Sequence, residues 1–169
     1  MVALREWLDS DVQPMVAMLA DPEIARWTRV PTPYGARHAT EFIARMRQQR
    51  MVGEAIGFAV VDARGSDLLG SIDLRVLSWE HLRGEVGYLV GAHARGRGVA
   101  PRAVRLLSSW GFAAVGLRRI GILVDPRNAA SQRVAAKAGF TREGVLRSYS
   151  TLKDERVDMI SYSLLPDDL

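Results

Sequence analysis

The stretch Arg95-Gly96-Arg97-Gly98-Val99-Ala100 stands between a strand-like run and an amphipathic helix. Two glycines at a strand-to-helix junction leave backbone N–H groups uncovered, and the positive end of the helix dipole points at the same place. Arg95, Arg97 and Arg102 add formal positive charge. The combination predicts a phosphate-binding loop and therefore an anionic ligand that carries a pyrophosphate.

Both flanks of this loop have the periodicity that the interpretation requires. Residues 84–90 are rich in β-branched and aromatic side chains, as in a strand. After the loop, apolar residues recur at helical spacing, with Arg102, Arg105 and Ser109 on the opposite face. The apolar positions are Val99, Ala103, Leu106, Leu107, Trp110 and Ala114.

Other glycine-rich patterns fit this stretch less well. It lacks the Lys-Ser/Thr pair of a P-loop, which argues against hydrolysis of a magnesium nucleotide. It also lacks the third glycine of the dinucleotide-binding fingerprint. Arg-Gly-Gly segments that bind single-stranded RNA are long and repeated, which this stretch is not. A basic turn without a ligand is the remaining alternative.

Two motifs in order resemble one enzyme family. Arg95, Gly98 and Ala100 match the acetyl-CoA-binding motif Arg/Gln-x-x-Gly-x-Gly/Ala of the GCN5-related N-acetyltransferases. About thirty residues later, a second block resembles the Asn-x-x-Ser helix and Lys-x-Gly-Phe ending of the branch that acetylates ribosomal-protein N-termini (RimJ/RimL). This block runs from Asp125 to Ser131 and continues with Val134, Lys137, Gly139 and Phe140. The resemblance spans nearly the whole chain.

This resemblance implies an α/β (α+β) fold in which a mixed, mostly antiparallel sheet is flanked by helices. Two central strands of this fold splay apart to admit the pantetheine arm of the cofactor. The resemblance also implies a single catalytic domain over residues 1–169, acetyl-CoA as cofactor, and no metal. We expect the following residues to bind the cofactor: Tyr88, Leu89, Val90, Arg95, Gly96, Arg97, Gly98, Val99, Ala100, Asn128, Ser131 and Lys137.

Composition is that of an ordinary globular domain, with 48% hydrophobic and 25% charged residues in 169. No apolar run approaches the roughly 18 residues of a membrane span, and the N-terminus does not resemble a secretory signal. The chain has no cysteine, so it has neither disulfides nor a thiol nucleophile. The net charge of +4 is spread without blocks. We therefore expect a cytoplasmic monomer or homodimer that binds neither membrane nor nucleic acid directly.

The secondary structure is predicted from periodicity and from turn and capping residues. We expect strands at residues 2–8, 55–61, 68–77, 84–90, 119–124, 140–151 and 156–165, with a turn at 62–66. We expect helices from an N-cap at Asp9 or Ser10 to the break at Asp21-Pro22, at 36–49, from 99 to near 116, and from Asn128 to Gly139. Residues 27–35 are predicted to be a loop. The unit from about 84 to 124 is expected to be parallel, and the remaining strand pairs antiparallel.

Acetyl transfer needs a group that accepts the proton of the attacking amine. Glu85 is our candidate base, since it shares a strand face with Gly87 and Leu89 and can relay the proton through water. The alternative role is an ion pair with Arg75 or Arg83. His81 is a weaker candidate base, favoured only by its ordinary pKa.

The leaving thiolate needs a proton or an equivalent hydrogen bond, and a backbone N–H near Leu89 is expected to stabilise the developing oxyanion. Many family members place a tyrosine one residue after the position of Val134, where this chain has Ala135. The resemblance to the ribosomal branch makes Ser131 the candidate donor instead. Its alternative role is that of an ordinary first-turn helix residue, and Asn128 can both cap the helix and bind pantetheine.

The acceptor is expected to be a primary amine, most like the N-terminal amine of a ribosomal protein, which attacks directly in a ternary complex. Glu23, Asp73 and Asp154 are candidates for attracting a cationic amine, and the pocket walls are expected from Trp27, Pro31, Tyr34 and Tyr149. One alternative is a small-molecule amine such as an aminoglycoside, a polyamine or an amino acid. Another is a protein without catalytic activity, either an acyl-CoA sensor or an RNA-binding accessory protein.

Overall fold

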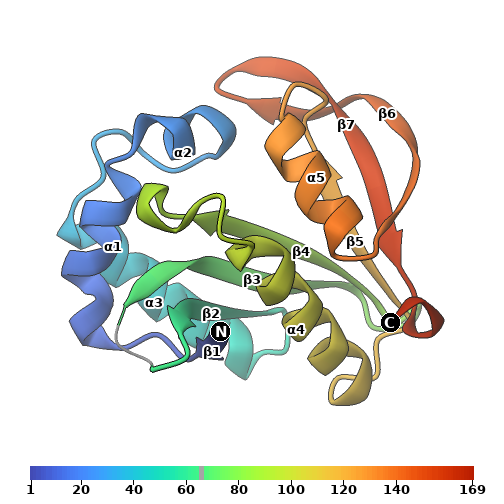
Figure 1. Ribbon diagram of the computed structural model, residues 1–169, viewed down its shortest axis with the longest axis horizontal. Helices are drawn as coiled ribbons and strands as arrows, with labels where there is room; N and C mark the ends of the chain where they lie inside the picture. Colours follow the sequence, from blue (N-terminus) through green and yellow to red (C-terminus); the bar gives the residue numbers. More distant parts are fainter. Residues whose placement is uncertain (65–66) are drawn as a thin grey trace.

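The computed structural model describes residues 1–64 and 67–169 (Figure 1). The strands are β1 (Val2–Arg5), β2 (Ala55–Asp62), β3 (Leu68–Ser78), β4 (Arg83–Val90), β5 (Arg119–Val124), β6 (Thr141–Leu152) and β7 (Glu155–Leu164). The helices are α1 (Val12–Leu19), α2 (Pro22–Trp27), α3 (Ala36–Met51), α4 (Val99–Ala113) and α5 (Ala129–Lys137). Short 3-10 turns occupy Asp9–Asp11, Ala92–Ala94 and Pro166–Asp168.

All seven strands form one sheet in the order β1-β2-β3-β4-β5-β7-β6. Among the strands of residues 1–64 and 67–169, only β4 and β5, which α4 connects, are parallel; every other neighbouring pair is antiparallel. The mixed, mostly antiparallel sheet predicted from the sequence is thus confirmed. The hairpin between β6 and β7 turns at Lys153 and Asp154, which both have positive φ.

Helices cover both faces of this sheet (Figure 1). The larger core cluster joins α4 and α5 to the sheet through buried residues such as Leu74, Leu107 and Ile120. A second cluster packs α1 and α3 against β1 and β2 through Met15 and Ile43. This arrangement buries the β-branched strands from two sides. It leaves the carboxyl ends of β4 and β5 uncovered.

The pair β4 and β5 diverges after a short contact. Their register includes only three pairs, of which the last is Glu85 with Gly121. Beyond this pair, β4 continues to Val90 and β5 to Val124 without facing each other in the ladder. The divergence confirms the predicted splay and gives the sheet a wedge-shaped opening.

The start of the chain differs from the sequence-based prediction. The first strand ends at Arg5, because Trp7 is buried in the second core cluster and leaves the sheet. Neither Asp9 nor Ser10 caps a helix; both lie in a 3-10 turn, and α1 begins only after it. Asp11 in that turn accepts two hydrogen bonds of 2.7 Å from Arg5.

Helix α2 was not predicted. Asp21-Pro22 ends α1 as expected but at once starts a new helix, because the Asp21 side chain accepts from the amide of Glu23 at 2.9 Å and Pro22 suits a first turn. The helix reaches Trp27, which shortens the predicted loop.

Helix α4 buries Val99, Ala103 and Leu107 as predicted, but the rest of the predicted apolar stripe is shifted. Leu106 and Trp110 are 46% and 39% exposed, and the Trp110 ring instead meets the edge of Phe58 at a centroid distance of 6.0 Å. Val104 and Ser108 are fully buried in their place. The predicted turn at residues 62–66 lies partly outside the described residues. No helix in residues 1–64 or 67–169 is long and apolar enough to cross a membrane.

Candidate active site

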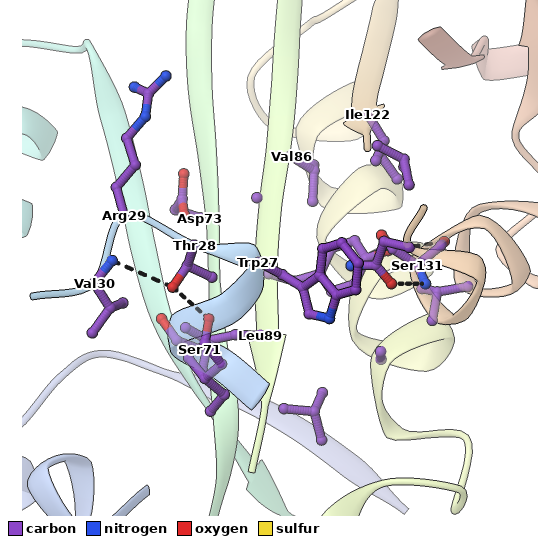
Figure 2. A pocket seen from close by; sticks show the side chains of 18 of the residues that line it. Trp27, Thr28, Arg29, Val30, Ser71, Asp73, Val86, Leu89, Ile122 and Ser131 are labelled. Carbon is purple, nitrogen blue, oxygen red and sulfur yellow. Dashed lines mark hydrogen bonds between the residues drawn. The ribbon is translucent and has the colours of Figure 1, made fainter. Parts of the chain in front are cut away.

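A cleft of about 1360 Å³ runs along the opening between β4 and β5. Its walls come from β3 and β4, the loop before α4, the start of α5, the segment from α2 to α3, and the β6–β7 hairpin. The predicted site residues that line it are Glu85, Tyr88, Leu89, Val90, Arg95, Gly96, Gly98, Val99, Ala100, Asn128, Ser131 and Lys137. Residues from distant parts of the sequence therefore meet in one cavity (Figure 2).

The loop before α4 presents bare backbone to this cleft. Gly96 and Gly98 have φ of +73° and +70°, a region that residues with a Cβ rarely adopt. A Cβ added at Gly96 would meet no atom within 4 Å. Gly98 is the N-cap of α4, so the positive end of the helix dipole lies at the loop. The geometry suits a phosphate group.

The arginines of this loop hold it in place. Arg95 Nη2 lies 2.6 Å from Asp21 Oδ2, and Arg95 Nε donates to the Val90 carbonyl at 3.3 Å. Arg102 Nη1 donates to the Arg97 carbonyl at 2.9 Å. Arg97 does not line the main cleft. Together with Arg102 it lines a second cavity of about 230 Å³. Arg97 therefore lies apart from the other predicted cofactor residues.

Backbone amides of β4 face the opening. The Gly91 amide donates to the Leu69 carbonyl at 2.9 Å, toward β3. Because peptide groups of a strand alternate in direction, the Leu89 amide also points to β3, and those of Tyr88 and Val90 point to the opening. The hydrogen-bond donors at this edge are thus the two neighbours of Leu89.

Tyr88 and the start of α5 bridge the opening. Tyr88 Oη lies 2.7 Å from Ser131 Oγ and 3.3 Å from the Ser131 carbonyl oxygen. Burial raises the pKa of Tyr88 to about 12, although the bond to Ser131 works against the shift. Asn128 caps α5 as predicted, because its Oδ1 accepts from the Ser131 amide at 3.0 Å. The Asn128 cap uses only the oxygen, and its Nδ2 group makes no hydrogen bond within the described residues.

Two carboxylates share one guanidinium on the other face of β4. Cross-strand pairing sets Arg75 opposite Glu85 and Asp73 opposite Gly87. Arg75 Nη2 donates to Glu85 Oε1 at 2.8 Å, while Arg75 Nε lies 3.3 Å from Asp73 Oδ2. A Cβ on Gly87 would lie 3.0 Å from Asp73 Oδ1, so the absence of a side chain makes room for this carboxylate. Glu85 thus forms one of the two ion pairs anticipated as its alternative role.

Both carboxyl groups hold protons more tightly than usual. Burial raises the pKa of Asp73 to about 6; Glu85 adds to this shift, and Arg75 and Arg45 oppose it. Burial also raises the pKa of Glu85, against the attraction of Arg75. In Figure 2, Asp73 and Leu89 lie on one side of β4 and Ser131 on the other.

The far end of the cleft is bounded by the segment after α2. Trp27 Nε1 donates to Glu23 Oε1 at 2.6 Å. Arg29 Nη2 donates to Ser150 Oγ at 2.9 Å and to the Thr151 carbonyl at 3.0 Å, which ties this segment to the β6–β7 hairpin. The predicted wall residues Trp27, Pro31, Tyr34 and Tyr149 all line the cleft.

Two predicted candidates lie elsewhere. His81 is exposed in the turn between β3 and β4, and Asp154 is in the hairpin turn between β6 and β7; neither lines the cleft. The structure therefore does not bring His81 or Asp154 into the cleft with the other candidates.

Sequence reasoning missed Arg29 and Arg45 at the cleft and ranked Asp73 only as an attractor of the amine. The pairing of Arg75 with Glu85 was anticipated as an alternative, but nothing in the sequence indicated that Asp73 shares the same guanidinium. Arg29 gave no signal, because its partners are more than 120 residues away in the chain.

Comparison with known proteins identifies the family. Residues 2–141 match the model of the acetyltransferase (GNAT) domain. The chain belongs to this family. YoaA of Bacillus subtilis (strain 168), an uncharacterized N-acetyltransferase, is 30% identical over 163 residues, which cover 96% of this chain and 92% of YoaA.

Two solved GNAT-like structures have the same fold. Mycobacterium smegmatis RimJ in complex with CoA-disulfide has a TM-score of 0.89 at 24% identity, over 99% of this chain and 83% of RimJ. The ribosomal-protein-S5-alanine acetyltransferase of Vibrio fischeri has a TM-score of 0.85 at 25% identity, over 99% of this chain and 94% of its own. The GNAT chain described here is an acetyl-CoA-dependent acyltransferase.

The residues of the cleft fit acetyl-CoA. The bare loop at Gly96 and Gly98 matches a pyrophosphate, and the outward amides of Tyr88 and Val90 match the carbonyl groups of a pantetheine arm. The amide hydrogens of Asn128 can donate to the same arm. Bound there, acetyl-CoA supplies a thioester, whose carbonyl carbon is open to attack by an amine.

Proposed function

We propose that this GNAT enzyme transfers the acetyl group of acetyl-CoA to the N-terminal amine of a protein, most like a ribosomal protein. The observation that carries the proposal is the cleft itself. It joins a loop that suits phosphate, a strand edge with free amides, and a partly buried carboxylate pair in one space. The fold of the ribosomal-protein-S5-alanine acetyltransferase supports the choice of acceptor.

The chemistry follows from the two faces of β4. The carboxylate pair of Glu85 and Asp73 accepts the proton of the ammonium group, since a group with a pKa near the working pH makes an efficient base. The neutral amine then forms the N–C bond as the C–S bond breaks, and the second proton that the nitrogen loses on becoming an amide passes to water. The amide N–H of Tyr88 or Val90 stabilises negative charge on the carbonyl oxygen, a contribution of typically about 3 kcal/mol. Ser131 donates a hydrogen bond to the departing sulfur, which takes its proton from water.

The charges of the acceptor end favour an amine with a single positive charge. Each carboxylate there lies within 4 Å of a guanidinium: Glu23 near Arg26, Glu41 near Arg37, and Asp73 and Glu85 near Arg75. A polyamine needs uncompensated negative charge at several points along its length, whereas this arrangement leaves it only at the Asp73–Glu85 pair. The long wall from Trp27 to the β6–β7 hairpin instead suits an extended peptide.

Thiol release from acetyl-CoA over a panel of acceptors tests the proposal. The panel includes peptides that begin with alanine or serine, the same peptides with a blocked N-terminus, spermidine, an aminoglycoside and free amino acids. We expect kcat/KM on the free peptides to exceed that on spermidine by about tenfold or more, and no turnover on the blocked peptides. Highest activity on a small amine would show that the acceptor is a small molecule and not a protein N-terminus. Acetyl-CoA binding without thiol release on any acceptor would indicate a sensor.

A cytoplasmic location is part of the same proposal. It rests on a chain without cysteine, which needs no oxidising compartment to fold.

A further inference from the structure

A pair of hydroxyl groups spans the opening between β4 and α5. One of them, that of Tyr88, has no part in the predicted catalytic roles. Tyr88 on β4 and Ser131 on α5 are 43 residues apart in sequence, yet their hydroxyl oxygens lie 2.7 Å apart. This distance is typical of a good O–H···O hydrogen bond. Both side chains line the cleft between the loop that suits phosphate and the carboxylate pair.

The direction of this bond follows from the second contact of Tyr88. If Ser131 donated to Tyr88, the Tyr88 proton would have only the Ser131 carbonyl oxygen as its acceptor. That oxygen is farther from Tyr88 Oη, at 3.3 Å. That carbonyl already belongs to the hydrogen-bond ladder of α5. Either hydroxyl can donate across the 2.7 Å contact, and the phenol is the more acidic and hence the stronger donor, so we take Tyr88 as donating to Ser131 Oγ. Ser131 then keeps its own proton free to point away from Tyr88.

Ser131 lines the cleft, so its free hydroxyl proton can point into this space. The Ser131 amide is already bonded to Asn128 Oδ1 at 3.0 Å, which fixes the first turn of α5. Ala135, one turn further along α5, has a methyl side chain and is fully buried, so α5 supplies no second hydroxyl at that position. The strand β4 supplies the second hydroxyl instead.

We propose that Tyr88 is a positioning residue for the leaving group: its hydroxyl donates to Ser131 Oγ and thereby directs the Ser131 proton to the sulfur of coenzyme A. The inference rests on the proposed function for the identity of the leaving group. No proton leaves Tyr88 in this scheme. Two hydrogen bonds in series stabilise the thiolate while the C–S bond breaks, and water later protonates the sulfur.

The first test measures the thiol of bound coenzyme A and needs no acceptor. An ordinary thiol titrates near pH ~8.5, and a directed hydrogen bond to the thiolate lowers this value. The absorbance of the thiolate is followed against pH in complexes of the wild type, Tyr88→Phe, Ser131→Ala and the double variant. Tyr162→Phe removes the hydroxyl of a neighbouring buried tyrosine on β7 and leaves the Tyr88–Ser131 bond in place, so it controls for the loss of a nearby hydroxyl.

We expect the pKa of the bound thiol to rise by about 1 unit in each single variant, the equivalent of one charge-assisted hydrogen bond. The double variant should match Ser131→Ala alone, because Tyr88 acts only through Ser131. Tyr162→Phe should match the wild type. A thiol pKa that Tyr88→Phe leaves unchanged, or that rises additively in the double variant, would overturn the proposal.

The second test changes the leaving group. Acetyl-seleno-CoA releases a selenolate, which is a weaker base than a thiolate and needs less help. With acetyl-CoA, Tyr88→Phe should lower kcat by about 5- to 50-fold and leave KM for the donor within twofold. With the seleno donor the loss in kcat should shrink to about twofold or less. An equal loss with both donors would mean that Tyr88 supports only the shape of the cleft.

The two proposals fail in different ways. Absence of turnover on every acceptor would reject the proposed function while the thiol titration still decides the role of Tyr88. Normal turnover with an unshifted thiol in the variants would reject only the role of Tyr88.

Discussion

In our proposal Asp73 and Glu85 act as one proton-accepting unit, because both carboxylates face the guanidinium of Arg75. Like charges that interact strongly titrate as a pair, so neither apparent pKa belongs to one residue alone. Asp73 lies opposite Gly87 and is thus nearer the open end of the strands than Glu85, which lies at the last β4–β5 pair. The sequence argument for Glu85 as the base stays a prediction, and the structure adds Asp73 to it.

Removing one carboxylate should move the acidic limb of the rate profile. In the wild type we expect kcat/KM to fall below about pH 6, where Asp73 gains a proton. Asp73→Asn and Glu85→Gln should each shift this limb to lower pH, because the remaining carboxyl loses its negative neighbour. Asp73→Asn should also lower kcat by about 100-fold or more. Rates measured from pH 5 to 9 check this, and an unaltered limb in both variants would exclude the pair.

The same pKa has a consequence for stability. Since the folded protein holds the Asp73 proton up to about pH 6 and the unfolded chain only to 3.8, the folded state loses stability as pH rises between these values. Asp73→Asn cannot ionise, so this loss should vanish. The variant should melt near the wild type at pH 4 and above it at pH 7.5. The gain is at most about 3 kcal/mol, since one pKa unit corresponds to about 1.4 kcal/mol.

Thermal melting at both pH values shows whether Asp73→Asn raises or lowers the stability of the folded protein. Glu85→Gln serves as the comparison, because its group is held by a direct hydrogen bond from Arg75 and should gain less. A lower melting temperature of Asp73→Asn at pH 7.5 would show that its attraction to Arg75 and Arg45 outweighs its burial.

At the scale of an element, the loop before α4 can be tested with a closely matched pair of glycines. Gly96 and Gly116 have φ of +73° and +79°, and a Cβ at either would meet nothing within 4 Å. Asp at either position should therefore cost similar backbone strain, about 1 kcal/mol. Only Gly96→Asp places a negative charge beside the N-terminus of α4. We expect its Kd for coenzyme A to rise at least tenfold, and that of Gly116→Asp to stay within twofold.

Calorimetry of both variants gives the comparison directly. A similar drop in affinity in Gly96→Asp and Gly116→Asp would show that backbone strain transmitted through α4, and not the added charge, weakens binding. An unchanged affinity in a folded Gly96→Asp protein would place the phosphates elsewhere.

At the scale of the molecule, the sheet has two parts joined by few strand contacts. β4 and β5 share only three register pairs, and α4 crosses between them. A ligand held by the loop before α4, the β4 edge and α5 binds both parts at once. Acetyl-CoA at 100 times its Kd should raise the free energy of unfolding by about 2.7 kcal/mol. For a chain of this length that corresponds to a rise in Tm of about 5–10 °C.

Hydrogen exchange locates this stabilisation. We expect added protection in the amides of β4 beyond Glu85 and in the first turn of α5, with β1 and β2 little changed. Protection confined to the N-terminal helices would argue for a binding site outside the β4–β5 opening.

The sequence alone determined what depends on neighbouring residues. The glycines of the loop, the Asn128 cap, the end of α5 at Gly139 and the bounds of β5 were all predicted, because dihedral preference, capping and periodicity are local properties. The same reasoning missed α2, since Asp21-Pro22 signals both an end and a start.

Tertiary structure alone decided which distant groups meet. Cross-strand register set Asp73 and Arg75 against Glu85, and the splay of β4 from β5 opened the edge that Tyr88 and Ser131 span. Arg29 reached the β6–β7 hairpin in the same way. Such contacts depend on how whole elements pack, and burial between those elements then raised the pKa of the carboxyl pair. A sequence pattern contains the residue types for this chemistry, whereas their distances and desolvation arise only in the folded chain.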